Sequence, residues 1–545
     1  MRQNAVRIVA ADGDPGLAAT PYMGWNTYYG VGGVFDERTI LSVANSLIDR
    51  GLTQAGYRLV WLDFGWASGR RDSRGELVID PQQWPHGLTW LTAWLHHHGL
   101  LAGIYTDAGN RGCDGQGVGS RGHYRQDANA FAAWGFDAVK LDFCGGAEEG
   151  LAPQVPDAEF AGALRNNSSH RSMLLNVDNF WAPGHIGGTR PAYSDSAYAN
   201  YRWAPQIAQS WRTDTDIGFT RSVLFANVLR NLDHDATHPE TAGPGHWNDP
   251  DYLGPELGMS SNEAQAQLSM WAMVAAPLVL GSDPRTLSQQ TIAMLENPQV
   301  IAIDQDPSGI QGMAVAQQGL GQVWVKPLVD GARAVALLNR GASALTIRTT
   351  ATAVGLAPAS GYRLENLWDH TTTTTAGAIT AVVPANSAVL YRVTTAAPLH
   401  AAAAHTAHVA PPARPRRSFV RRGEVHRRLV ARSRRAPRST VSRQPQPQVS
   451  RDLSRTAAAK ARALSDRGNP ELGPLTGPAL PMLLPSPPGG VEGPGSLWVL
   501  VGLAIALGLV SVSGMFTPVR NRIPIGDMPG RLRRVFGARG RDGFR

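Results

Sequence analysis

The chain has 545 residues, too many for one compact core, so more than one domain is expected. Its net charge of +8 is uneven: residues 411–465 hold 16 Lys and Arg against two acidic residues, residues 517–545 hold 8 Arg against two, and residues 1–410 carry a net charge of −10. The basic segment 411–465 contains Phe419 as its single aromatic residue, so base stacking is nearly absent. We therefore expect no nucleic-acid partner, and a solvated linker is favoured over a nucleic-acid arm.

Short apolar stretches alternate with amphipathic segments from about residue 20 to residue 305. Eight strands are predicted at Tyr22–Tyr28, Arg58–Asp63, Leu101–Thr106, Ala138–Asp142, Ser172–Val177, Gln209–Asp214, Gly245–Asp249 and Pro277–Gly281. Between them lie helix-like segments such as Glu37–Arg50, whose apolar residues share one face. Eight strand–helix units predict a (β/α)8 TIM barrel over residues 18–305. A doubly wound open sheet is the structural alternative, but it would use fewer strands, and no GxGxxG or Walker motif is present.

The pattern changes after the eighth strand. Short apolar runs separated by turn residues at Val323–Val325, Ala334–Leu338, Leu345–Ile347 and Ala388–Tyr391 predict a small antiparallel β-sandwich domain over residues 306–396. The run Thr371–Thr375 is too polar for a core and is expected to be an exposed strand or loop.

A disordered linker, a membrane span and a cytoplasmic tail are predicted beyond the β domain. Residues 397–496 form a basic, Pro-rich stretch without apolar periodicity up to about residue 470, which is typical of disorder. Residues 497–516 form an uncharged 20-residue run, long enough for one transmembrane helix across a bilayer of ~30 Å. Arg520 and Arg522 follow at once, so the positive-inside rule places residues 517–545 in the cytoplasm and the barrel outside the cell.

This arrangement predicts a protein anchored in the membrane at the cell surface, whose basic linker meets anionic lipid or wall polymer. Export needs a signal, yet residues 1–12 contain no apolar stretch of signal-peptide length. We therefore expect the true start to lie upstream; the alternative is an export route that the sequence does not display. No pattern in the sequence indicates an oligomeric state.

Polar and aromatic side chains gather where the predicted barrel strands end. In chain order they are Trp25, Asp63, Tyr105, Lys140, Asp142, Arg212, Asp216 and Asp251. A single Asp at a strand end is more often a turn or helix cap, but the joint occurrence at one face of a barrel favours a site. Two separated carboxylates suffice to cleave a glycosidic bond, since one can attack while the other transfers protons. This chemistry needs no metal or cofactor, and the run His96–His98 is predicted to lie mid-helix at the surface.

The chain contains two cysteines, Cys113 and Cys144, and each follows a predicted strand. A disulfide is plausible if those strands are neighbours, and it would imply an oxidising compartment. Two free core thiols remain the alternative at this point.

Five motifs in order give the chain a specific resemblance. They are Tyr22–Asn26, Gly103–Asn110 with Cys113 beyond it, Lys140–Cys144, Arg212 four residues before Asp216, and Gly245–Asp251. Together they resemble the family 27 glycoside hydrolases of the α-galactosidase type, over roughly residues 18–395. The resemblance implies a retaining, exo-acting hydrolase that releases terminal α-linked galactose from oligo- or polysaccharides without a cofactor.

The resemblance also implies roles for individual residues. Asp142 would be the nucleophile and Asp216 the general acid/base, and Lys140 would keep Asp142 ionised. The expected substrate-binding residues are Trp25, Asp63, Phe64, Tyr105, Lys140, Asp178, Arg212 and Asp251. Within the family pattern Cys113 and Cys144 form a disulfide.

Two departures from the family pattern leave the sugar open. Phe64 stands where a second Asp is usual, and Asn176–Trp181 differs from the usual substrate loop. Because Phe64 cannot hydrogen-bond, the activity of a β-L-arabinopyranosidase or of an isomalto-dextranase is an alternative on the same scaffold. A non-catalytic carbohydrate-binding protein of the cell surface is the alternative from another class; loss of either carboxylate would favour it, and both are present.

Overall fold

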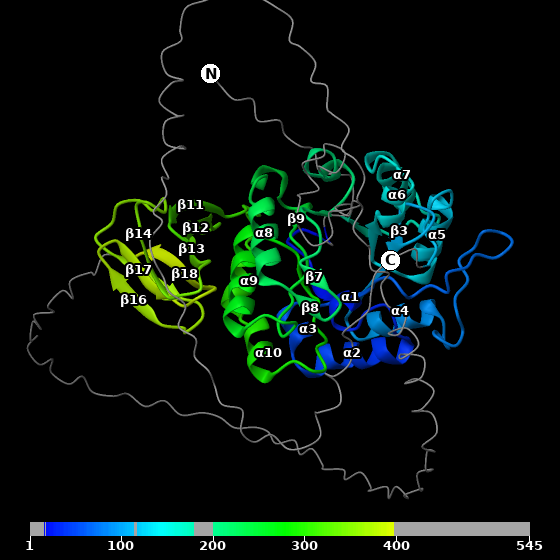
Figure 1. Ribbon diagram of the computed structural model, residues 1–545, viewed down its shortest axis with the longest axis horizontal. Coiled ribbons are helices and arrows are strands. Elements are labelled where there is room, and N and C mark those ends of the chain that lie inside the picture. Colours follow the sequence, from blue (N-terminus) through cyan, green and yellow to red (C-terminus); the bar gives the residue numbers. More distant parts are fainter. Residues whose placement is uncertain (1–15, 17, 114–116, 179–199, 397–545) are drawn as a thin grey trace, which may run out of the picture. The chain divides into compact units, whose positions relative to one another are not determined.

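The computed structural model describes residues 16, 18–113, 117–178 and 200–396 (Figure 1). Eight parallel strands form one sheet in the order β10-β1-β2-β3-β4-β5-β6-β9. Their bounds are β1 Met23–Asn26, β2 Leu59–Leu62, β3 Leu101–Asp107, β4 Ala138–Asp142, β5 Leu174–Asp178, β6 Ser210–Arg212, β9 Trp247–Asp249 and β10 Leu278–Leu280. Each lies within a predicted strand or overlaps it, which confirms the barrel-type parallel sheet.

The sheet curls until its two outer strands approach each other. No ladder joins β9 to β10 within the described residues; Leu253, just beyond β9, forms an isolated parallel bridge with Leu280 of β10. The Leu253 amide donates to the Val279 carbonyl at 2.7 Å, and the Gly281 amide donates to the Leu253 carbonyl at 2.7 Å. The barrel is therefore closed by a one-residue seam.

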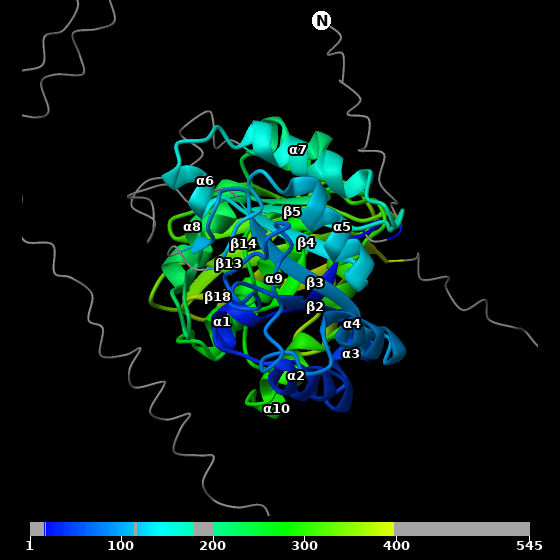
Figure 2. The same cartoon turned by 90° about the vertical axis from the view of Figure 1, so that its right-hand side faces the viewer.

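Helices cover the outside of the strands, and Figure 2 shows α2, α4, α5 and α7 around β2 to β5. The α-helices are α1 Thr27–Gly30, α2 Glu37–Asp49, α3 Leu52–Ala55, α4 Leu88–His97, α5 Tyr124–Trp134, α6 Cys144–Glu148, α7 Gln154–Arg165, α8 Phe225–Asp235, α9 Ser261–Val274, α10 Gln289–Leu295 and α11 Pro298–Asp304. Short 3-10 turns occupy Asn200–Arg202, Ala204–Gln206 and Pro239–Thr241. As predicted, α2 buries Ile40, Val43, Ala44 and Leu47.

The predicted mid-helix position of the histidine run His96–His98 is wrong. Because α4 ends at His97, the run His96–His98 forms the C-terminal end of this helix rather than its middle. His97 and His98 are exposed, as expected, whereas His96 is half-buried and its Nε2 lies 2.7 Å from Asp137 Oδ2.

A β-sandwich domain follows the barrel. Its strands are β11 Met313–Gln318, β12 Gly321–Pro327, β13 Arg333–Asn339, β14 Leu345–Thr350, β15 Tyr362–Asn366, β16 Thr372–Thr375, β17 Ala378–Val383 and β18 Ser387–Thr395. Six form a sheet in the order β11-β12-β13-β18-β15-β16, and β14 pairs with β17. Val323 and Leu337 of the large sheet share a buried core with Ile347 and Ile379 of the small one. The threonine run forms the exposed edge strand β16, in agreement with its polarity.

The β domain packs against α9 of the barrel. The buried Lys326 Nζ donates to the Ala272 carbonyl at 2.9 Å, and Trp368 Nε1 donates to Ser269 Oγ at 3.0 Å. Trp324 and Leu390 belong to the same hydrophobic core as Trp271 of α9. This packing explains why α9 has buried residues on nearly all sides.

The predicted linker, the transmembrane helix at 497–516 and the tail lie outside the described residues. Within the part of the chain that the structure describes, no helix combines the length and the apolar character needed to cross a membrane.

Candidate active site

The register of three neighbouring strands sets a row of carboxylates at their carboxyl ends. Asp107 of β3 is level with Asp142 of β4, and Asp142 is level with Asp178 of β5. Lys140, two residues earlier on β4, points to the same side of its strand as Asp142 because side chains alternate along a strand. Parallel pairing therefore brings together charges that are far apart in the sequence.

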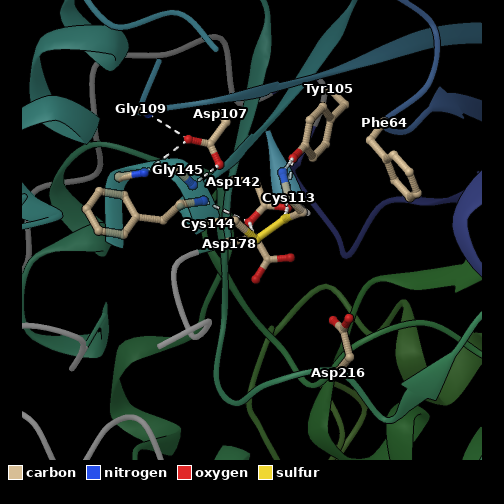
Figure 3. Close-up of a disulfide and its surroundings, with 12 residues drawn as sticks. Phe64, Tyr105, Asp107, Gly109, Cys113, Asp142, Cys144, Gly145, Asp178 and Asp216 are labelled. Atoms are coloured by element: carbon tan, nitrogen blue, oxygen red, sulfur yellow. Dashed lines mark hydrogen bonds between the residues drawn. A yellow bond between two sulfur atoms is a disulfide. The ribbon is translucent and has the colours of Figure 1, made fainter. Parts of the chain in front are cut away.

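One pocket opens at these strand ends. It is lined by Tyr28, Asp63, Phe64, Cys113, Lys140, Asp142, Cys144, Asp178, Thr215, Asp216 and Phe219. Figure 3 shows Asp142 and Asp178 beside the disulfide and the Asp216 carboxylate across the pocket from them. The structure thus brings both predicted catalytic carboxylates to one pocket, together with Asp63, Phe64, Lys140 and Asp178 of the predicted binding set.

A network of ion pairs joins the charged groups. Lys140 Nζ lies 3.2 Å from Asp63 Oδ2 and 3.2 Å from Asp178 Oδ2. Arg212 contacts Asp178 Oδ2 at 3.0 Å, Asp216 Oδ1 at 2.9 Å and Asp251 Oδ2 at 3.1 Å. Asp178 therefore bridges the two cations, and Arg212 orients Asp216.

Burial dominates the protonation behaviour of the site. It raises the pKa of Asp142 well above its ordinary value, and Asp178 raises it further, whereas Lys140 opposes the rise. Burial lowers the pKa of Lys140, but Asp63 and the other nearby anionic partners outweigh this effect, so the pKa is raised overall. Lys140 is consequently the cation that favours the ionised form of Asp142.

Arg212 and Asp251 act beneath the pocket rather than on its surface. Both are 1% exposed. Asp251 has φ +87°, a conformation that non-glycine residues rarely adopt. Its Oδ2 is held there by Tyr29 Oη at 2.5 Å and the Ile217 amide at 2.8 Å, in addition to Arg212. The predicted binding residue Asp251 is therefore an anchor for Arg212.

Cys113 and Cys144 form a disulfide, which settles the alternatives left open by their spacing. Cys113 Sγ lies 3.1 Å from Asp142 Oδ2; a disulfide sulfur carries no proton, so this is a contact and not a hydrogen bond. Asp107, Cys113, Asp142 and Cys144 also cluster as donors of the kind that hold metal ions. With both sulfurs in a disulfide, the cluster offers no thiolate ligand.

Asp107, which the sequence analysis did not assign, joins the two segments that carry the disulfide. Its Oδ1 accepts from the Gly109 amide at 2.6 Å, and its Oδ2 accepts from the Gly145 amide at 3.0 Å (Figure 3). Burial raises the pKa of Asp107 to about 7, against the lowering effect of these amides. The sequence did contain a signal for Asp107, because this residue ends β3 just as Asp142 ends the next strand, β4.

One predicted sugar contact is corrected. Trp25 is fully buried and donates from Nε1 to the Ser282 carbonyl at 2.9 Å, because alternation along β1 turns Asn26 inward and Trp25 away. Tyr105 is 6% exposed, its hydroxyl lies 3.5 Å from Cys113 Sγ, and Lys140 Nζ lies 5.8 Å from its ring centre, so its contact with the sugar stays a prediction. Tyr28, which the sequence analysis missed, lines the pocket.

Phe64 forms an apolar wall with Tyr28. The two rings are 5.8 Å apart in an edge-on arrangement. A Cβ on Gly33 would lie 2.4 Å from the Phe64 ring, so this glycine makes room for it. The site therefore has one aromatic side and one anionic side, which suits the apolar face and the hydroxyls of a sugar.

A parallel barrel whose strand ends carry paired carboxylates, a lysine and an arginine around one pocket defines a glycosidase of the TIM-barrel type. Comparison with known proteins gives the particular family. The family model of α-galactosidase A matches residues 32–306, and that of the α-galactosidase C-terminal β-sandwich domain matches residues 318–393. The chain belongs to the α-galactosidase family.

Individual relatives span the same region. The chain is 34% identical over 382 residues to an α-galactosidase of Oryza sativa subsp. japonica, covering 70% of this chain and 86% of that protein. It is 37% identical over 339 residues to α-galactosidase A of Cellvibrio japonicus, covering 61% and 79%. The crystal structure of α-galactosidase I from Mortierella vinacea matches with a TM-score of 0.62 at 27% identity, covering 70% of this chain and 98% of that one.

Proposed function

We propose that this protein is a retaining, exo-acting α-galactosidase that releases terminal α-linked galactose by double displacement. The observation that carries the proposal is the presence of Asp142 and Asp216 on one pocket, together with the family membership. The α-galactosidases of Oryza sativa and Cellvibrio japonicus support galactose as the released sugar.

In the first step Asp142 attacks the anomeric carbon and forms a covalent glycosyl-enzyme, while Asp216 gives its proton to the leaving oxygen. In the second step Asp216 takes a proton from water, and the hydroxide so formed displaces Asp142. Two inversions give net retention. Lys140 suits this scheme because it favours the ionised nucleophile, and Arg212 suits it because it holds Asp216 at the pocket.

The proposed sugar is tested by hydrolysis with the full-length protein. The substrates are aryl α-galactoside, α-N-acetylgalactosaminide, β-L-arabinopyranoside and α-glucoside. We expect the highest kcat/KM on the α-galactoside. A dominant rate on the arabinopyranoside or glucoside would mean that the aromatic wall at Phe64 has changed the sugar, and no hydrolysis of any substrate would favour a binding protein.

Substitution separates the roles of the two carboxylates. Asp142→Asn should lower turnover of every α-galactoside by about 10³-fold or more, because the nucleophile is lost. Asp216→Asn should slow the hydrolysis of galactosides with sugar leaving groups far more than that of aryl galactosides, because aryl leaving groups need little protonation. Asp49→Asn, at an exposed carboxylate of α2, is the matched control and should leave rates unchanged. Near-normal rates in Asp142→Asn would remove it as the nucleophile.

We further propose that the enzyme acts outside the cell, anchored through residues 497–516. The uncharged run, the arginines after it and the disulfide at the site support this location. Protease added to intact cells should then digest the barrel of the full chain; complete protection of the barrel would contradict the proposal.

A further inference from the structure

A short hairpin follows Asp216 directly and carries an exposed aromatic ring. It consists of β7 Gly218–Phe219 and β8 Ser222–Val223, paired antiparallel. Phe219 is 54% exposed, although it lines the same pocket as Asp216. A large apolar side chain that gains little from burial in its own fold is a candidate contact for a ligand.

Backbone hydrogen bonds hold the hairpin in place. The Arg221 amide donates to the Tyr29 carbonyl at 2.7 Å, and the Val223 amide donates to the Leu257 carbonyl at 2.7 Å. The Leu224 amide donates to the Ile217 carbonyl at 3.2 Å, which closes the hairpin onto the residue after Asp216. The backbone that presents Phe219 is thus held before any ligand arrives, so binding to the ring does not require the hairpin to be ordered.

The chemistry locates the leaving group relative to this ring. A general acid must lie within hydrogen-bonding reach of the glycosidic oxygen that it protonates. The group attached to that oxygen therefore lies next to Asp216, on the solvent side, because the Asp216 side chain is 36% exposed while the opposing Asp142 is 6% exposed. Phe219 lies three residues beyond Asp216, lines the same pocket and is the most exposed of the pocket's aromatic side chains among the described residues.

We propose that Phe219 is the stacking platform for the leaving-group sugar and selects galactosides whose leaving group is a pyranose with an apolar C–H face. The ring and a pyranose face offer matched apolar surfaces, and Tyr28 and Phe64 form the other aromatic lining of the pocket among the described residues. This inference rests on the proposed function and adds the class of leaving group to it.

The test compares two substrates of the full-length protein that differ in their leaving groups. One is an α-galactosyl-(1→6)-glucose disaccharide, and the other is α-galactosyl fluoride, whose leaving group has no ring. Phe219→Ala should lower kcat/KM on the disaccharide about 5- to 10-fold, the range expected for one lost aromatic contact, and change it less than about twofold on the fluoride. Phe219→Trp should retain the preference for the disaccharide.

Leu224→Ala is the matched control, because Leu224 is 57% exposed near the same hairpin and does not line the pocket. It should leave both substrates unaffected. Equal losses on both substrates in Phe219→Ala, or no loss on either, would overturn the platform. An unaltered protein that cleaves neither substrate would instead overturn the proposed function, so the two failures are distinguishable.

Discussion

At the scale of single residues, the ionisation of the site's carboxylates depends on a small number of cations. Lys140 and Arg212 are the basic side chains of the ion-pair network, and they contact four carboxylates, of which Asp178 touches both cations. Removing one partner of a buried ion pair leaves an uncompensated charge. The ionisation of Asp142 should therefore respond strongly to Lys140.

Lys140→Met should move the acid limb of the pH dependence of kcat/KM to higher pH. Burial already raises the pKa of Asp142 and Lys140 opposes that rise, so loss of the cation raises this pKa further. The nucleophile must be deprotonated, hence activity should be lost at a higher pH as the medium is acidified. At neutral pH we expect kcat/KM to fall about 10- to 100-fold. A pH–rate profile checks this, and an unshifted acid limb would contradict it.

The residue types of the site could be predicted from strand ends and motifs, but not every side-chain direction. Asp63, Lys140 and Asp142 follow from the ends of buried strands, and the structure places all three on the pocket. Trp25 could have been excluded by alternation against Asn26, whose amide donates to Asp63 Oδ2 at 2.8 Å. Tyr28 lies on the short helix α1 after its strand, and the alternation of side chains along a strand does not predict which way a helical side chain points.

At the scale of elements, the loop after β3 lies in close contact with the start of α6, and glycine makes this approach possible. A Cβ on Gly145 would lie 2.0 Å from the Arg111 carbonyl oxygen and 2.9 Å from Asp107 Oδ1. Both segments carry a disulfide cysteine beside Asp142. Any added atom here must move backbone at the active site.

Gly145→Ala should destabilise the protein by about 1–3 kcal/mol and lower its activity, because overpacking displaces the backbone. Gly162→Ala is the matched control: Gly162 lies inside α7, and a Cβ there would meet nothing within 4 Å. This control should stabilise by about 0.5–1 kcal/mol through helix propensity. Urea unfolding of both variants measures whether each substitution raises or lowers the free energy of unfolding. Stabilisation by both would disprove the close-contact argument.

The barrel strands were predictable from the sequence, while the two-residue strands of the hairpin were not. The β1 strand ends at Asn26, two residues before the predicted end, because the Asn26 side chain caps α1. The two-residue strands β7 and β8 escaped prediction, since alternation needs at least four residues to be recognised. The hairpin beside Asp216 was consequently missed, together with Phe219.

At the scale of the whole molecule, the disulfide at the active site also stabilises the fold. It closes a loop with a sequence separation of 31 residues. Cys113→Ser with Cys144→Ser should lower the free energy of unfolding by about 3–4 kcal/mol, mainly by freeing the unfolded chain. Urea unfolding with and without reductant checks this. The unaltered protein should match the double variant once reduced, and an unchanged midpoint would contradict the expectation.

The one-residue seam at Leu253 gives the β-sandwich domain a mechanical role. Every other pair of neighbouring barrel strands is joined by a ladder of hydrogen bonds. The boundary between β9 and β10 at Leu253 is therefore the place where the barrel should separate most easily. α9 connects the two strands on either side of this line, and the β domain clamps α9 from outside. Asp251 stands two residues from the seam. The β domain thus supports the barrel wall beside Asp251, so loosening of this domain would disturb Arg212, which positions Asp216, before it disturbed more distant parts of the surface.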